Sequence, residues 1–194
     1  MHGFVVTHPG GALLVDTGAG GPGDMLDSWR VVNRSVADAL AELDMSPADI
    51  DLVVNTHLHF DHCGQNAVFA HAPGYVQRAE LARAERESPE LYEWFSFASA
   101  RWELLDGDAE IVPGVSVVRT PGHTAGHQCV VVSGTDVLIG DAAYTPVVYA
   151  DPSVGSRIPG QAADFEAFAS SLGRLRELGP ERVHFCHHTD VVHG

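Results

Sequence analysis

Four side chains that can bind a metal ion lie within six consecutive positions of the segment Thr56-His57-Leu58-His59-Phe60-Asp61-His62. The segment follows Asp51-Leu52-Val53-Val54-Asn55, an apolar run that predicts a buried strand. Side chains two positions apart in an extended segment point the same way, so His57 and His59 can bind one cation together. A turn after Phe60 directs Asp61 and His62 toward a second position nearby. Imidazole and carboxylate groups at this density suit Zn²⁺ or a similar first-row metal, rather than ordinary surface or core histidines.

This His-x-His-x-Asp-His motif after an apolar strand resembles the metallo-β-lactamase superfamily. The family's other motifs occur in their usual order, one before this segment and three after it. They are Asp16-Thr17-Gly18, Pro121-Gly122-His123-Thr124, Asp141 after Val137-Leu138-Ile139-Gly140, and His187 after Val183-His184-Phe185-Cys186. The resemblance covers nearly the whole chain. It implies an α/β fold, the αβ/βα sandwich of the family, in which helices flank two mixed β-sheets.

The resemblance also implies two divalent metal ions, with zinc as the first choice and iron, manganese or cobalt as alternatives. His57, His59 and His123 then hold the first ion, Asp61, His62 and His187 hold the second, and Asp141 bridges them. A water shared by two cations ionises near neutral pH, so the implied reaction is hydrolysis through a metal-bridging hydroxide.

Two details of this assignment stay open in the sequence. Adjacent residues of a strand face opposite ways, so only one of His187 and His188 reaches the site, and we favour His187. Asp16 is expected beneath the metals as a support for the ligand loop, with a plain Asp-x-Gly turn as the alternative.

The residues around Asp141 indicate a more specific class of substrate. Gly140-Asp141-Ala142-Ala143-Tyr144, with the two histidine motifs, most resembles the branch that contains N-acyl-homoserine lactone lactonases. In that branch the tyrosine points at the substrate carbonyl, where a phenol can donate a hydrogen bond to the forming oxyanion. Asp61 can pass a proton to the alkoxide leaving group. The alternative for Tyr144 is a loop tyrosine packed on the sheet.

Other activities of the fold remain as alternatives, and function has to be argued from the site. A glyoxalase II-like thioester hydrolase shares the metal set, but the tail Thr189-Asp190-Val191-Val192-His193-Gly194 lacks the basic residues expected for a glutathione conjugate. β-Lactam cleavage fits less well, because no secretory leader opens the chain. Retention of all seven ligands argues against a non-catalytic domain, and a redox di-iron domain usually needs an attached flavin domain.

The resemblance implies a small-molecule ester, lactone or thioester as the substrate, and composition argues against two other kinds of partner. The formal net charge of −15 argues against nucleic acid, and no apolar run approaches the ~20 residues of a membrane span. Three cysteines without framework spacing suggest reduced thiols in the cytoplasm. We interpret Cys63 and Cys186 as small buried residues rather than ligands. A homodimer is left open.

The elements that position these residues are predicted from periodicity within one domain, residues 1–194. Strands are expected at 3–7, 12–15, 68–70, 75–77, 115–119, 128–132, 136–139 and 182–186, and an irregular loop over 145–160. An amphipathic helix is expected over 28–43, with Trp29, Val32, Val36, Leu40 and Leu43 on its apolar face, and another over 165–178. A helical insertion over 79–106 is expected to overhang the site, with Leu91, Trp94, Phe95, Ala98, Trp102 and Leu105 as its packing stripe. Phe97 lies off that stripe and is the candidate for substrate contact.

Overall fold

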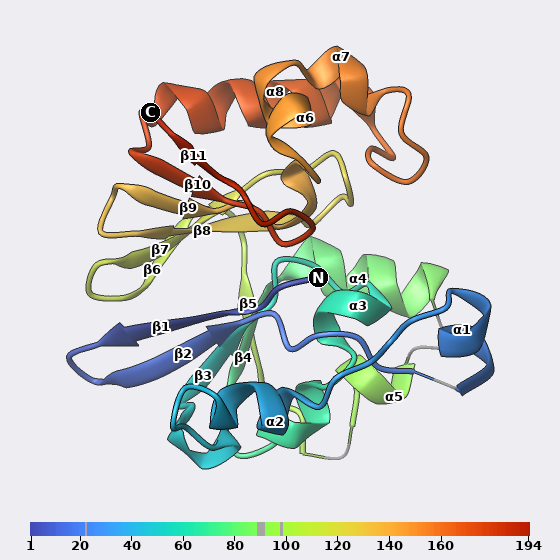
Figure 1. Ribbon diagram of the computed structural model, residues 1–194, viewed down its shortest axis with the longest axis vertical. Helices are drawn as coiled ribbons and strands as arrows, with labels where there is room; N and C mark the ends of the chain where they lie inside the picture. Colours follow the sequence, from blue (N-terminus) through green and yellow to red (C-terminus); the bar gives the residue numbers. More distant parts are fainter. Residues whose placement is uncertain (22, 89–91, 98) are drawn as a thin grey trace.

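The structure, a computed structural model, describes residues 1–21, 23–88, 92–97 and 99–194. Its first half contains a five-stranded sheet in the order β1-β2-β3-β4-β5, seen in the lower part of Figure 1. β1 (Phe4–His8) pairs antiparallel with β2 (Gly11–Val15), and the remaining neighbours pair in parallel. Those neighbours are β3 (Leu52–Val54), β4 (Gly74–Gln77) and β5 (Trp102–Leu105).

The second half contains a six-stranded sheet in the order β11-β10-β9-β8-β7-β6. Its pairs are antiparallel except β9 with β10, which run in parallel. The strands are β6 (Ala109–Val112), β7 (Val115–Arg119), β8 (Gln128–Val132), β9 (Asp136–Leu138), β10 (Arg182–His184) and β11 (Val191–His193).

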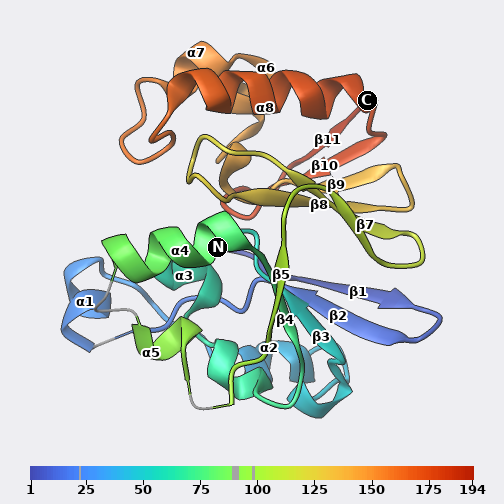
Figure 2. The same cartoon turned by 180° about the vertical axis from the view of Figure 1, so that it is seen from behind.

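The two sheets face each other across a core of alternating strand residues. Leu13, Val15 and Val54 of the first sheet belong to one buried cluster with Val117 and Val130 of the second. Helices cover the outer faces, as Figures 1 and 2 show: α2 (Val36–Ala41) lies on the first sheet and α8 (Phe165–Glu177) on the second. The αβ/βα sandwich with two mixed sheets is therefore confirmed.

The remaining helices are short and lie mostly toward one end of the sandwich. They are α1 (Gly23–Ser28), α3 (Phe60–Cys63), α4 (Arg78–Glu87), α5 (Tyr92–Phe95), α6 (Pro146–Ala150) and α7 (Pro152–Gly155), with 3-10 turns η1 (Pro47–Asp49), η2 (Asn66–Phe69) and η4 (Gly140–Ala142). None of the helices that the structure describes is long and apolar enough to cross a membrane.

The helix expected over 28–43 is wrong for its first half. Apart from Ser28, the last residue of α1, only Val36–Ala41 is helical, and of the expected apolar face only Val36 and Leu40 are buried. Arg30 has a φ of 54°, which no helix can continue through, and the β-branched Val31-Val32 that follow favour helix weakly. Trp29 and Val32 are consequently 69% and 98% exposed.

The expected insertion over 79–106 is helical only in α4 and α5. Trp102–Leu105, predicted as the end of a helix, instead forms β5, which pairs in parallel with β4. Trp102, Glu103 and Leu104 also alternate between apolar and polar side chains, as in a strand. Pairing with β4 decides between the helical pattern and the strand pattern. Leu91 and Ala98 lie outside the described residues.

Two smaller predictions also need correction. Residues 68–70, expected as a strand, belong largely to the 3-10 turn η2. The irregular loop expected over 145–160 contains α6 and α7, because Pro146 and Pro152 each occupy the first turn of a helix behind the caps Thr145 and Asp151.

Candidate metal centre

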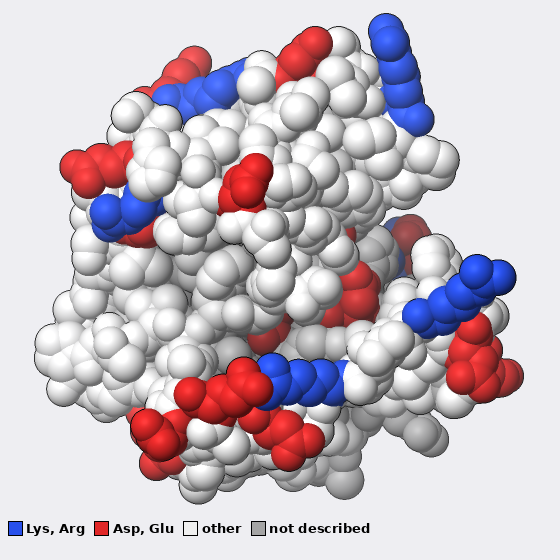
Figure 3. Space-filling model, in the orientation of Figure 1, with Lys and Arg blue, Asp and Glu red and all other residues white. Residues whose placement is uncertain are grey.

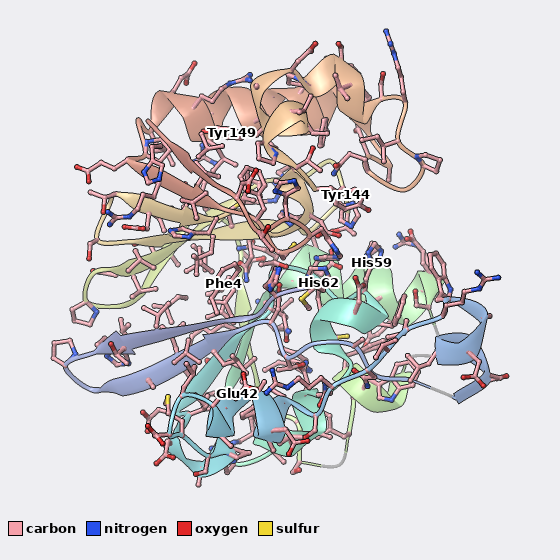
Figure 4. All side chains as sticks on the ribbon, in the orientation of Figure 1. Phe4, Glu42, His59, His62, Tyr144 and Tyr149 are labelled. Carbon is pink, nitrogen blue, oxygen red and sulfur yellow. The ribbon has the colours of Figure 1, made fainter. Side chains whose placement is uncertain are left out.

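The seven predicted ligands gather at one end of the sandwich, where chain segments leave the parallel strands. Because β2 and β3 are parallel, and β9 and β10 are parallel, their carboxyl ends share an edge in each sheet. His57 to His62 follow β3, Asp141 follows β9, His187 follows β10, and His123 lies in the loop between β7 and β8. Figure 4 shows His59 and His62 pointing into the space between the two halves, with Tyr144 opposite them.

Three imidazoles converge on the first position. His57 Nε2 lies 2.9 Å from His59 Nδ1 and 3.2 Å from His123 Nε2, and His123 Nε2 lies 3.1 Å from His59 Nδ1. Nitrogens bound 2.0–2.1 Å from a tetrahedral zinc ion are about 3.3 Å apart, so the spacing is close to that of a shared cation.

The other ring nitrogens determine the protonation of this group. His123 Nδ1 donates to the carbonyl of Gln161 at 3.1 Å. His57 Nδ1 donates to Thr56 Oγ1 at 3.1 Å, since that hydroxyl gives its own proton to Asp16. Both Nε2 atoms therefore direct lone pairs at each other, an arrangement that a cation stabilises. Burial and the neighbouring imidazoles also keep these rings neutral, and burial followed by His123 lowers the pKa of His59 to about 4.

The second position combines imidazoles with carboxylates. His62 Nε2 and His187 Nε2 each lie 3.2 Å from Asp141 Oδ1, and they lie 3.6 and 3.5 Å from Asp61 Oδ2. His62 Nε2 is buried and has no hydrogen-bond partner among the described residues. Its Nδ1 lies 2.7 Å from Asp16 and donates to it, so Nε2 is the nitrogen that faces the carboxylates of Asp61 and Asp141. A buried ring nitrogen between carboxylates favours a positive charge at that point, either a proton or a bound cation.

Asp141 joins the two positions. One of its oxygens faces the second group, and the other lies 3.2 Å from His123 Nε2 and 3.6 Å from His57 Nε2. Burial alone would raise the pKa of Asp141, but His62, His187 and His57 outweigh it and hold the pKa well below the ordinary value. The carboxylate is thus ionised and placed to serve two cations.

His188 lies outside this group of residues. Its Nδ1 accepts a hydrogen bond from the backbone N–H of Asp190 and lies 3.7 Å from the Asp190 carboxylate. His187 rather than His188 therefore reaches the candidate centre.

Asp16 lies beneath the centre, as the resemblance implies. Its carboxylate accepts from the backbone N–H and hydroxyl of Thr56, both at 2.8 Å, and from His62 Nδ1. Burial lowers the pKa of His62, but the carboxylates of Asp141, Asp16 and Asp61 outweigh it and raise the pKa well above the ordinary value. The same negative field attracts a metal cation.

Two supporting residues were not identified from the sequence. His127 is fully buried, and its Nε2 accepts from the backbone N–H of Asp141 at 3.0 Å. Gln161 accepts from His123 through its carbonyl and donates from its side-chain amide to the carbonyl of Asp141 at 2.8 Å. His127 was available as the last residue of Pro-Gly-His-Thr-Ala-Gly-His, whereas nothing near Gln161 in the sequence signals this role.

The two cysteines beside predicted ligands differ. Cys63 packs in the core with Leu58, Val76 and Phe95, as expected. Cys186 is also buried, but its Sγ donates to Asp141 Oδ1 at 3.1 Å and lies within reach of the ligand atoms of His62 and His187. Cys186 therefore belongs to the candidate centre, where it is a hydrogen-bond partner of Asp141 as well as a packing residue.

A groove of about 1310 Å³ opens over the centre. Five of the predicted ligands line it: His59, Asp61, His123, Asp141 and His187. Figure 3 shows this face of the molecule hollowed between the two halves, with acidic side chains inside the hollow. The site is therefore accessible to a small molecule.

Tyr144 lines the groove next to the ligands. Its ring lies 5.1 Å from that of His187 and 5.8 Å from that of His123, and its hydroxyl donates to the carbonyl of Gly160 at 3.1 Å. Burial, then Asp141 and Asp61, raise the pKa of Tyr144, so the phenol stays protonated at neutral pH. It can act there as a hydrogen-bond donor.

The groove is also lined by apolar side chains, which we call the apolar wall and define as Trp29, Val31, Val32, Leu40, Leu43 and Phe60. The rings of Trp29 and Phe60 lie 5.9 Å apart. The loop that carries Trp29 is fastened by Gln65, which donates to the carbonyls of Ala19 and Arg34 and accepts from the N–H of Val36.

Phe97, the candidate for substrate contact, is not part of this groove. It lines a separate small pocket with Val53, Phe69 and Trp102, which are core residues of the first sheet. The prediction that Phe97 contacts the substrate is therefore wrong. After α5 the chain turns toward the sheet edge to form β5, and Phe97 lies in this turn beside residues of the first sheet rather than in the groove.

Comparison with known proteins agrees with this geometry. A family model described as Metallo-beta-lactamase superfamily matches residues 3–187. An N-acyl homoserine lactonase from Bacillus sp is 35% identical over 158 residues, covering 79% of this chain and 59% of that protein. An N-acyl homoserine lactonase from Bacillus cereus is 32% identical over 186 residues, covering 87% of this chain and 72% of that protein. This chain thus spans less than two thirds of the length of the Bacillus sp relative.

Solved structures give the same picture. One is an N-acyl homoserine lactone hydrolase with the product N-hexanoyl-L-homoserine bound at the catalytic metal center, 28% identical with a TM-score of 0.76, covering 93% of this chain and 78% of that one. Another is a mutant of Bacillus thuringiensis AiiA with N-decanoyl-L-homoserine bound at the active site, 27% identical with a TM-score of 0.77, covering 94% and 79%.

Proposed function

This chain belongs to the metallo-beta-lactamase superfamily, and we propose that it is a dinuclear metal-dependent hydrolase that opens the ring of N-acyl-homoserine lactones. The observation that carries the proposal is a single groove lined by two kinds of side chain. Five of the seven converging imidazole and carboxylate ligands line it, and so does the apolar wall. A polar lactone head and an apolar acyl tail match those two kinds of lining. The relatives named above act on, or hold the product of, such a molecule.

The metal assignment follows from the donors. We assign His57, His59 and His123 to the first ion, Asp61, His62 and His187 to the second, and Asp141 to both. Imidazole-rich sets with carboxylates suit zinc, and iron, manganese and cobalt accept the same donors. When bound, the pair of cations supplies an activated water and withdraws electrons from the substrate carbonyl.

The chain's own residues supply the rest of the chemistry. The Tyr144 phenol, turned from Gly160 toward the lactone carbonyl, donates a hydrogen bond to the oxygen as charge develops there. Asp61, partly exposed to the groove, would take up the proton released by the attacking water and pass it to the departing ring oxygen, so the carboxylate is regenerated. The apolar wall orients the acyl chain so that the lactone carbonyl faces the ligand cluster. A cytoplasmic location fits the three cysteines, which are unpaired and buried.

Metal analysis combined with a substrate panel tests the proposal. Purified protein is expected to contain close to two equivalents of zinc, iron, manganese or cobalt. It should hydrolyse an N-acyl-homoserine lactone faster than a glutathione thioester or nitrocefin, with one proton released per ring opened. Undamaged protein without metal, or metal-loaded protein that prefers the thioester or the β-lactam, would contradict the proposal.

The apolar wall gives a prediction about chain length. Trp29→Ala is expected to reduce the preference for a decanoyl over a butanoyl lactone by about tenfold, because ~0.8 kcal/mol is lost for each methylene that is no longer covered. The measurement is kcat/KM for both lactones. Phe165→Ala is the control, since Phe165 is an exposed aromatic on α8 outside the groove. An unchanged ratio in Trp29→Ala would show that the acyl chain lies elsewhere.

A further inference from the structure

Helix α4 reaches the candidate centre through one buried carboxylate. Glu80, the third residue of α4, is fully buried, and Arg83 one turn later is 6% exposed. Figure 2 shows α4 along the boundary between the two halves of the sandwich. A buried acidic side chain is costly unless its oxygens are fully hydrogen-bonded, so its partners indicate why it is there.

One oxygen of Glu80 serves the loop that carries His57 and His59. Oε1 accepts from the backbone N–H of Leu58 at 2.9 Å. The same oxygen accepts from Arg83 Nε and Nη2 at 3.0 and 2.7 Å, and Nη2 also approaches the Leu58 carbonyl at 3.5 Å. The peptide groups between the two histidines are thus held from α4 on both their donor and acceptor sides.

The other oxygen serves the loop that carries His123. Oε2 accepts from Thr124 Oγ1 at 2.6 Å and from the backbone N–H of Gly126 at 3.2 Å. That loop lies directly on the helix, because a Cβ at Gly126 would meet the Glu80 backbone at 2.2 Å. These two loops come from opposite halves of the sandwich, and the three imidazoles they carry must meet at one point.

We propose that Glu80 is a positioning residue for the three-imidazole metal site, joining the His57–His59 loop to the His123 loop through opposite oxygens of one carboxylate. Its oxygens already accept from all the donors named above, so it is not a metal ligand. Only a carboxylate accepts on both sides, since glutamine presents an NH₂ group to one of the two sets of donors. The inference rests on the proposed metal binding and does not depend on the substrate.

The test separates the two metal positions. His187→Ala removes a ligand of the second position and leaves the first, and His59→Ala does the reverse. Glu80→Gln is introduced into each, and zinc dissociation constants are measured by competition with a chromophoric chelator. In the His187→Ala background we expect Glu80→Gln to raise the dissociation constant roughly 10–100-fold, the usual effect of losing a partner behind a ligand. In the His59→Ala background we expect less than about a threefold change.

Two control variants distinguish a general loss of packing from the loss of ligand positioning. Glu87→Gln removes the same charge from the same helix and also contacts Arg83, at 3.5 Å, but Glu87 is half exposed and touches neither loop. It is expected to leave both dissociation constants unchanged. Thr124→Val removes one donor and keeps the Glu80–Arg83 pair, so it should weaken the first position alone even if Glu80→Gln folds poorly.

The outcomes are distinguishable. Equal weakening at both positions, or unchanged zinc affinity in folded Glu80→Gln and Thr124→Val proteins, would overturn the inference. An unsubstituted protein that binds no metal would instead contradict the proposed function.

Discussion

Replacing Asp141 with alanine is expected to lower the metal content from about two ions per chain to less than one and turnover on the lactone by on the order of 10³-fold or more. The physical reason is that one oxygen of Asp141 faces each group of ligands, at 3.2 Å from His62 and His187 and 3.2 Å from His123. Removing the carboxylate deprives both metal positions of a negatively charged ligand, and it removes the one side chain that faces both groups. Elemental analysis and steady-state hydrolysis at saturating zinc measure the two effects.

Asp136→Ala is the matched control for this substitution. Asp136 lies at the other end of β9, where it accepts hydrogen bonds from Arg182 and His184 rather than from the ligand cluster. It should keep two metal ions and ordinary turnover. Full metal content and unimpaired turnover in Asp141→Ala would remove Asp141 from the centre and with it the assignment of a bridged pair.

The second large effect concerns Tyr144. Tyr144→Phe keeps the ring contacts with His123 and His187 and removes one hydrogen-bond donor. Loss of one such donor in an acyl-transfer site typically costs roughly 10²–10³-fold in turnover. A cation beside the same oxygen carries part of the charge, so we expect ~10–100-fold here. The loss should fall on kcat more than on KM, because the ground-state carbonyl carries little charge.

The measurement is lactone hydrolysis by both proteins at matched metal loading, and metal content should not change. Tyr149→Phe is the control: Tyr149 packs against Phe185 in the core of the second half, away from His59 and His62 (Figure 4). It should turn over like the unsubstituted protein. If Tyr144→Phe also does so, Tyr144 has no part in the reaction.

The ligand residues could be predicted because their chemistry is local. His57, His59, Asp61 and His62 directly follow an apolar run, and parallel strands bring their carboxyl ends to one edge. A stretch with two periodicities is different. Trp102 fits a helical stripe and a strand equally well, and its ring fills the space beside Gly74 on the neighbouring strand, where a Cβ would lie 2.7 Å from it. Such a choice depends on a partner far away in the chain.

Supporting residues were harder to predict for a related reason. Glu80 and Arg83 have the spacing of an ordinary solvent-exposed ion pair on a helix, and nothing local signals that loops from both halves cover them. Gln161 is a single polar residue in a loop with no motif. The exposure of Trp29 follows from the positive φ of Arg30. An arginine rarely adopts this conformation, so the sequence does not predict it.

The apolar wall is built largely from residues 29–43, and the loop before α2 is fastened to the rest of the protein through the side chain of Gln65. None of the seven assigned ligands belongs to that segment. On the proposed function, the groups that react and most of the residues that select the acyl chain therefore lie in separate stretches of sequence. Substitutions in the segment are then expected to change which acyl chains are accepted without abolishing hydrolysis, and grafting it between related enzymes should transfer a substrate preference while the recipient keeps its own chemistry.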